Sequence, residues 1–121
     1  MKRLFALILV VALSAAALGL TVFAYSHEGT YNGKYWVSHL TKTKNSATTS
    51  FFWAGGGVVQ SKGTIRYQRT NVLPSPTYAI QFNAVGKKQL SKTQNVASGY
   101  VVTQVSQQYF IGNAQVDSLI Q

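Results

Sequence analysis

Apolar and polar side chains alternate over several short stretches of the chain, as they do in β-strands with one buried face. The clearest stretch is TYAIQFNAV, from Thr77 to Val85. The apolar face of this predicted strand consists of Tyr78, Ile80, Phe82 and Ala84. The longest stretch is YVVTQVSQQYFI, from Tyr100 to Ile111, and its more apolar face consists of Val101, Val105, Tyr109 and Ile111. Both stretches predict strands that cover a core on one side.

Further strands are predicted between residues that interrupt regular structure. The segments with strand-like composition or alternation are SATTSFFW (46–53), GTIRYQRT (63–70) and QLSKTQNV (89–96). The glycines at 55–57 predict a bend, and Pro74 and Pro76 predict a loop. We expect a turn at 86–88, whereas residues 114–121 fit either a short strand or a helical turn.

About six or seven short strands, spaced by about ten residues, predict an all-β domain with the architecture of a small antiparallel β-sandwich or barrel. The first pair of strands falls within residues 28–50. We expect a single domain, residues 25–121, because the chain is too short for two.

The first 24 residues have the pattern of a helical signal peptide. Lys2 and Arg3 precede the apolar run LFALILVVAL, and small residues follow it. We place the cleavage site after Ala24, which leaves residues 25–121 as a secreted domain. The uncharged run from Leu4 to Ser26 is also long enough to cross a bilayer, so an uncleaved N-terminal membrane anchor is the alternative. In both cases the domain lies outside the cytoplasm.

Composition limits what can stabilise this domain and what it can bind. The chain has no cysteine, so disulfides and thiolate metal sites are excluded, and hydrophobic packing must stabilise the fold. Eleven Lys and Arg residues stand against two acidic residues, which gives a net charge of +9. Such a surface attracts anions, which for an exported protein are envelope polymers, lipid headgroups or acidic glycans rather than nucleic acid. The alternative is that the charge only keeps the domain soluble.

Acidic residues are too few to predict an enzyme or a cofactor site. Glu28 and Asp117 are the only carboxylates, and they lie near opposite ends of the domain, whereas paired-carboxylate hydrolysis needs two at a defined separation. His39, Asp117 and a serine could form a Ser-His-Asp triad, but no nucleophile-elbow motif accompanies them. We therefore expect no catalytic residues and no cofactor.

One metal site depends on where the signal is cleaved. Cleavage after Ala24 leaves the terminus Tyr25-Ser26-His27. Its amine, two backbone nitrogens and the His27 imidazole could surround Cu(II) or Ni(II) in a plane. The alternative is a disordered terminus in which His27 happens to be the third residue.

Lysines and aromatic residues are the candidates for contacts with an anionic target. The lysines fall mainly in predicted turns, where they could form one anion-binding rim or merely protect sheet edges. Aromatic rings beside them could stack on sugars or lie at a membrane interface, although most of the aromatic residues are expected in the core. The predicted target-binding residues are Tyr35, Trp36, Lys42, Lys44, Lys87 and Lys88.

The first strands also resemble the opening of the mature domain in the lactococcin-972-like bacteriocins. The matching residues are Glu28-Gly29-Thr30-Tyr31, Gly33, Val37-Ser38 and the segment KTKNSAT at 42–48. The resemblance implies a small β-sandwich that self-associates and inhibits related bacteria at the envelope, for which a cell-wall precursor is the candidate target. It implies no catalytic residues.

The sequence therefore favours a small secreted, cationic, bacteriocin-like antibacterial protein that binds the anionic cell envelope of related Gram-positive bacteria. The alternative is a secreted or membrane-anchored adhesive surface module without enzymatic activity. A small secreted hydrolase is the third hypothesis.

Overall fold

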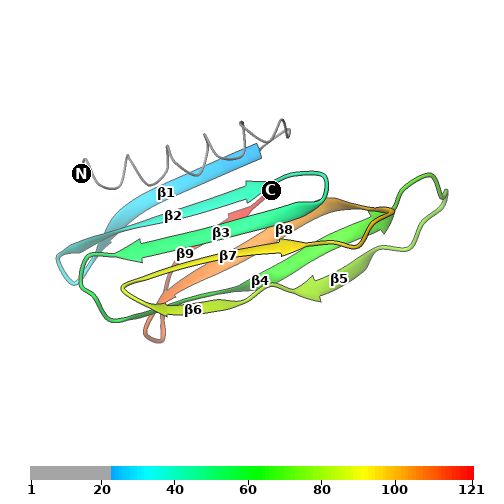
Figure 1. Ribbon diagram of the computed structural model, residues 1–121. Helices are drawn as coiled ribbons and strands as arrows, with labels where there is room; N and C mark the ends of the chain where they lie inside the picture. Colours follow the sequence, from blue (N-terminus) through cyan, green and yellow to red (C-terminus); the bar gives the residue numbers. More distant parts are fainter. Residues whose placement is uncertain (1–22) are drawn as a thin grey trace.

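Two antiparallel β-sheets pack face to face in the computed structural model of the chain (Figure 1). The structure describes residues 23–121. Nearly all of the predicted signal peptide, residues 1–24, lies outside them, as does most of the alternative anchor segment. Within residues 23–121, no helix is long and apolar enough to cross a membrane. The predicted all-β sandwich is confirmed.

Sheet A contains four strands in the order β1, β2, β3 and β7. Their bounds are β1 (Phe23–Tyr31), β2 (Lys34–Lys42), β3 (Ser46–Trp53) and β7 (Gln89–Asn95). Asn32 and Gly33 join β1 to β2 with φ angles of 51° and 73°, the left-handed conformation that a two-residue hairpin turn requires. The segment at 28–50 thus contains a β-hairpin, as predicted.

Sheet B is organised around its two longest strands, β4 (Val58–Arg69) and β8 (Tyr100–Ile111). β5 (Tyr78–Gln81) and β6 (Ala84–Lys87) pair with successive halves of β4. β9 (Ala114–Ile120) pairs with the other side of β8. Residues 114–120 therefore form a strand and not a helical turn, the two alternatives that the sequence left open. Residues 23–121 contain nine strands rather than six or seven, partly because the predicted strand at 77–85 is divided in two.

The division of that strand occurs at Phe82 and Asn83. Phe82 is fully buried, as its position in the alternating pattern predicts. Its N–H donates to Gly63 O at 2.9 Å, and the Gly63 N–H donates to Asn83 Oδ1 at 3.1 Å. The Asn83 side chain thus replaces a backbone acceptor, and regular pairing with β4 resumes in β6.

β8 has the predicted bounds, but its first residues face the opposite way from the prediction. Its pairing with β4 shifts between Arg66 and Tyr67, which leaves Thr103 without a paired residue on β4. This extra residue is a β-bulge, and it moves the alternation by one position. Val102 is therefore buried, where the pattern predicted Val101.

Aromatic rings from both sheets meet at the centre of the core. The rings of Phe51 and Tyr109 are stacked, with centroids 5.2 Å apart. Tyr109 is fully buried, and its hydroxyl lies 2.8 Å from Thr49 Oγ1. The aliphatic residues of the core include Leu40, Val59, Ile65, Val105 and Leu119. The inner faces of the strands therefore supply a continuous apolar layer.

Burial raises the pKa of the Tyr109 phenol, because its ionised form would lose solvation in the core. Above pH 10 the unfolded chain loses this proton while the folded chain keeps it, so the free energy of unfolding should fall as pH rises. The part due to Tyr109 is about 1.4 kcal/mol per pH unit. Urea unfolding at a series of alkaline pH values should show this slope in the wild type and not in Tyr109→Phe. Equal slopes would contradict the prediction.

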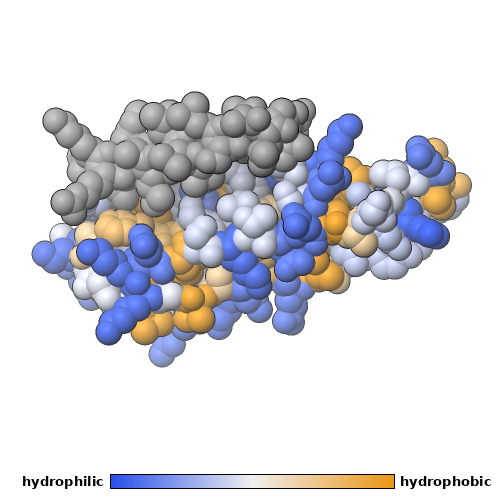
Figure 2. All heavy atoms as spheres, viewed as in Figure 1, coloured by the Kyte–Doolittle hydropathy of each residue, from blue (hydrophilic) through white to orange (hydrophobic). Residues whose placement is uncertain are grey.

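The loop between β4 and β5 projects beyond the end of sheet A (Figure 1). Leu73 is 97% exposed and Val72 is 41% exposed, and apolar residues are in view at the tip of the loop (Figure 2). The Arg69 N–H donates to Ser75 Oγ at 3.1 Å and thereby closes the base of the loop. Pro74 lies in this loop, as predicted.

Candidate functional site

Three polar side chains from both sheets meet beside the core. His27 on β1 and Ser38 on β2 are directly paired, and Asp117 on β9 points toward them. The His27 imidazole donates from Nδ1 to Asp117 Oδ1 at 2.8 Å, and Ser38 Oγ donates to Asp117 Oδ2 at 2.5 Å. The Asp117 side chain is only 11% exposed. One of the two acids is therefore held between the sheets.

This cluster differs from the Ser-His-Asp triad considered from the sequence. In such a triad the histidine accepts the serine proton, whereas here Ser38 and His27 both donate to the carboxylate of Asp117. His39 lies on the opposite face of β2, where its Nδ1 is 2.5 Å from Ser26 Oγ. Burial lowers the pKa of His39. The arrangement fixes Asp117 but does not activate Ser38 as a nucleophile.

We expect Asp117→Asn to lower the free energy of unfolding by about 1–3 kcal/mol, because a charge-assisted pair of hydrogen bonds is lost in a mostly buried place. The matched control is Glu28→Gln, which makes the same chemical change at an exposed position and should alter stability by less than about 0.5 kcal/mol. Urea denaturation measures both. Similar effects of the two substitutions would contradict the structural role of Asp117.

His27 belongs to a paired strand in this structure. Residues 25–27 form part of the β1–β2 ladder, and the His27 Nδ1 that a copper site would use is bonded to Asp117. Binding of Cu(II) by this terminus would have to displace that bond. Within residues 23–121, no group of three or more His, Asp, Glu or Cys side chains is arranged to hold a metal ion. The copper site stays a prediction that depends on cleavage after Ala24.

The four lysines predicted to bind a target lie at opposite ends of the sandwich (Figure 1). Lys42 ends β2, and Lys44 lies in the β2–β3 turn, which bonds to the start of β8. Lys87 and Lys88 lie at the β6–β7 turn, which bonds to the β3–β4 turn. The length of β3, about 23 Å, separates the two groups. The four lysines therefore cannot form the single anion-binding rim considered from the sequence, because the turns that carry them lie at different ends of the sandwich.

Tyr35 and Trp36 are neighbours on β2 but point to opposite faces. Tyr35 is 36% exposed, and its ring centroid lies 6.3 Å from that of Phe52. Trp36 is part of the core, where Gly29 on the paired strand leaves room for its indole. A Cβ at Gly29 would lie 2.7 Å from that ring. Tyr35 is accessible to a ligand, whereas Trp36 is a packing residue and not the surface residue that the sequence suggested.

The outer face of sheet B carries positive side chains and no carboxylate. Lys62 and Arg66 on β4 are exposed and alternate with core residues of that strand. Lys87 on β6 is exposed on the same face. Glu28 lies on β1 of sheet A, and Asp117 points between the sheets. Lys62 is thus within a strand rather than in a turn, contrary to the general prediction for the lysines.

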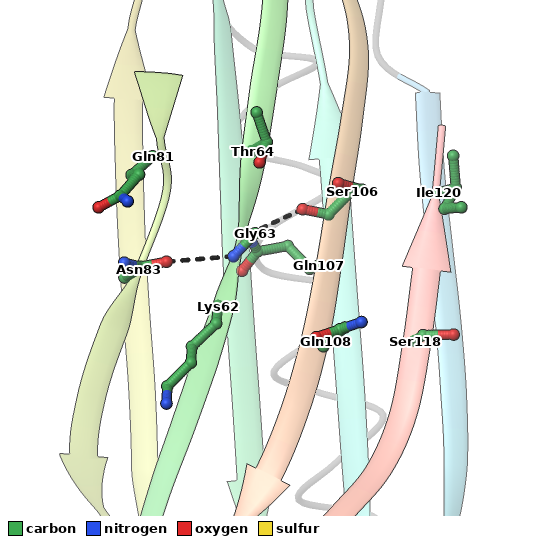
Figure 3. A pocket seen from close by; sticks show the side chains of 10 residues that line it. All are labelled: Lys62, Gly63, Thr64, Gln81, Asn83, Ser106, Gln107, Gln108, Ser118 and Ile120. Atoms are coloured by element: carbon green, nitrogen blue, oxygen red, sulfur yellow. Dashed lines mark hydrogen bonds between the residues drawn. The ribbon is translucent and has the colours of Figure 1, made fainter. Parts of the chain in front are cut away.

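A groove open to solvent crosses this face over the middle of β4 and β8 (Figure 3). Its volume is about 480 Å³. Most of its lining side chains are carboxamides and hydroxyls, together with one amine: Gln81, Asn83, Gln108, Thr64, Ser106, Ser118 and Lys62. These groups can both donate and accept hydrogen bonds, so the groove suits a polar ligand with oxygen-rich groups.

Gln107 and Gly63 fix the floor of the groove. Gln107 is 1% exposed, and its Nε2 donates to Phe82 O at 2.7 Å and to Ser106 O at 3.0 Å. A Cβ at Gly63 would lie 1.8 Å from Ser106 O and 2.5 Å from Gln107 Nε2. Only glycine leaves room here, so the Gln107 amide can bond across β4 to the β5–β6 junction.

Sequence reasoning missed this groove. Each lining residue is an ordinary outward-facing polar residue of a strand, and nothing in the local pattern shows that β5, β4, β8 and β9 lie side by side. The one local signal is Gly63 within an otherwise regular strand, which indicates a close approach of another part of the chain.

Comparison with known proteins found no family model that matches the chain, and no curated protein or solved structure that is significantly similar to it. The resemblance to the lactococcin-972-like bacteriocins stays a prediction, and so do the self-association and the cell-wall precursor that it implies.

Proposed function

We propose that this chain is an exported, bacteriocin-like antibacterial protein that binds anionic polymers of the Gram-positive cell envelope on the outer face of sheet B. The observation that carries the proposal is the charge of that face: Lys62, Arg66 and Lys87 lie there with no carboxylate. Asp117 is held between the sheets, so Glu28 is the only acidic side chain at the surface among residues 25–121.

Charge and groove act at different distances. The positive field reaches about 8–10 Å at physiological ionic strength and concentrates anionic polymers near the protein. The carboxamides and hydroxyls of the groove then supply short-range hydrogen bonds to phosphate, carboxylate or sugar oxygens. A repeating polymer can contact several cations at once, so weak individual contacts add up to stable binding.

Neutralisation of the three cations tests the proposal. We expect Lys62→Gln/Arg66→Gln/Lys87→Gln to weaken binding to isolated Gram-positive cell walls by about tenfold, because each exposed ion pair contributes up to about 1 kcal/mol. The control, Lys34→Gln/Lys44→Gln/Lys88→Gln, removes the same charge from the two ends of the sandwich. It should weaken binding much less. Equal losses of wall binding in the two variants would refute a binding site on sheet B and would mean that binding depends only on the total charge.

Two further measurements connect binding to function. Walls stripped of their anionic polymers should bind neither the wild type nor the sheet B variant. Added salt should weaken the binding of the wild type to intact walls. Growth inhibition of related Gram-positive strains should fall in the sheet B variant together with wall binding. Binding without any inhibition would favour the adhesive surface module instead.

A further inference from the structure

The β4–β5 loop presents apolar side chains at the most projecting point of the described structure (Figures 1 and 2). Leu73 is 97% exposed, and the neighbouring Val72 is 41% exposed. Pro74 and Pro76 are also exposed, and neither has a backbone N–H that would need a partner in an apolar environment. Single apolar residues on a flat surface are common, but a cluster at the tip of a loop can enter another phase without moving the sheets.

Three tyrosines form a cluster at the base of this loop. The ring centroid of Tyr67 lies 5.6 Å from that of Tyr78 and 5.3 Å from that of Tyr100, and the remaining pair is 5.7 Å apart. Tyr78 is 38% exposed. A tyrosine ring is apolar with a polar hydroxyl, so tyrosines accumulate where hydrocarbon meets water.

Positive charge surrounds the same end of the molecule. Arg69 precedes the loop, and its guanidinium carbon lies 5.9 Å from the Tyr100 ring centroid. Lys44 lies in the β2–β3 turn, whose backbone bonds to the start of β8. No acidic residue occurs between Glu28 and Asp117 in the sequence, so the loop and the strands that support it contain none. This end is complementary to a negatively charged surface.

We infer that the tip of the β4–β5 loop inserts into the interfacial region of an anionic lipid bilayer. Leu73 and Val72 enter the boundary of the acyl chains, the tyrosines lie at the level of the interface, and Arg69 pairs with lipid phosphates. Apolar burial and attraction to anionic headgroups together provide the two signals that stable, reversible membrane binding needs. The inference does not rest on polymer binding by sheet B, which uses another surface.

The absence of cysteine allows a position-specific test. Leu73→Cys and Val85→Cys in the full-length chain each create a single thiol, which can carry an environment-sensitive fluorophore such as NBD. Val85 is 70% exposed on β6, so both labels begin in water, and only their positions differ. With vesicles containing phosphatidylglycerol, we expect the NBD emission at position 73 to shift to the blue and its intensity to rise about threefold or more. The emission at position 85 should change little. Pure phosphatidylcholine vesicles should give a much smaller change at 73.

Each other outcome overturns the inference. No change at position 73, or an equal change at 85, would exclude insertion of the loop. A change at 73 that grows with protein concentration in the absence of vesicles would show that a second copy of the chain covers the tip. Arg69→Gln should reduce the preference for phosphatidylglycerol, and an unaltered preference would contradict its assigned contact. Because the vesicles contain no wall polymer, a positive result here together with failed wall binding would refute only the proposed function.

Discussion

Replacement of Gly63 by valine is expected to lower the free energy of unfolding by about 3 kcal/mol or more. A Cβ at this position would lie 1.8 Å from the backbone oxygen of Ser106 and 2.5 Å from Gln107 Nε2. Because the first of these atoms belongs to the backbone, β4 and β8 would have to separate. The hydrogen bond from Gln107 to Phe82 O would be strained or lost. Urea denaturation followed by circular dichroism measures the effect.

Gly33→Asn is the control for this substitution. Gly33 has a φ of +73°, and a Cβ there would have no neighbour within 4 Å. Asparagine tolerates this conformation better than other side chains do, so we expect a loss of less than about 1 kcal/mol. A small effect at Gly63, comparable with the control, would mean that the two long strands of sheet B are not held as closely as the structure shows.

Phe51→Ala should be similarly damaging, with a loss of about 3–5 kcal/mol. Phe51 is 1% exposed and stacks on Tyr109 between the sheets, so its removal would leave a cavity at the centre of the core. The total stability of such a domain is about 5–15 kcal/mol, so this one change could leave it marginally folded.

The neighbouring Phe52 provides a matched control for Phe51→Ala. Phe52 has the same side chain on the same strand, but it is half-buried and points to the outer face of sheet A. We expect Phe52→Ala to lower the free energy of unfolding much less than Phe51→Ala does, as measured by thermal or urea unfolding. If the two substitutions had equal costs, the assignment of the inner and outer faces of β3 would be incorrect.

The contrast between these two phenylalanines also shows what the sequence alone can predict. Strand-like composition between residues that interrupt regular structure predicted the bounds of β3 and β8. Period-two alternation predicted the inward direction of Phe82, because burial of one face imposes that pattern directly on the chain. Three consecutive aromatics at 51–53 exceed what one face can bury, and the structure resolves this by placing Phe51 inward and Phe52 outward.

Features that depend on pairing between distant strands could not be predicted. His27 and Ser38 reach Asp117 across 90 and 79 residues, and no local pattern specifies that β9 lies beside β1 and β2. The triad considered from the sequence consequently combined Asp117 with His39, whereas the structure places His27 beside it. The groove was missed for the same reason, because its polar groups come from several strands of sheet B that are separated in sequence.

With the bulge at Thr103, Tyr100 lies on the same side of the sheet as Tyr67 and Tyr78. Deletion of Thr103 would remove the bulge and leave Val102 opposite Tyr67 and Tyr100 opposite Arg69. Tyr100 would therefore stay on the side of Tyr67 and Tyr78. The part of β8 that lines the groove follows the bulge and would keep its register. Thr103 is therefore the position at which β8 can change in length during evolution with both the tyrosine cluster and the groove preserved.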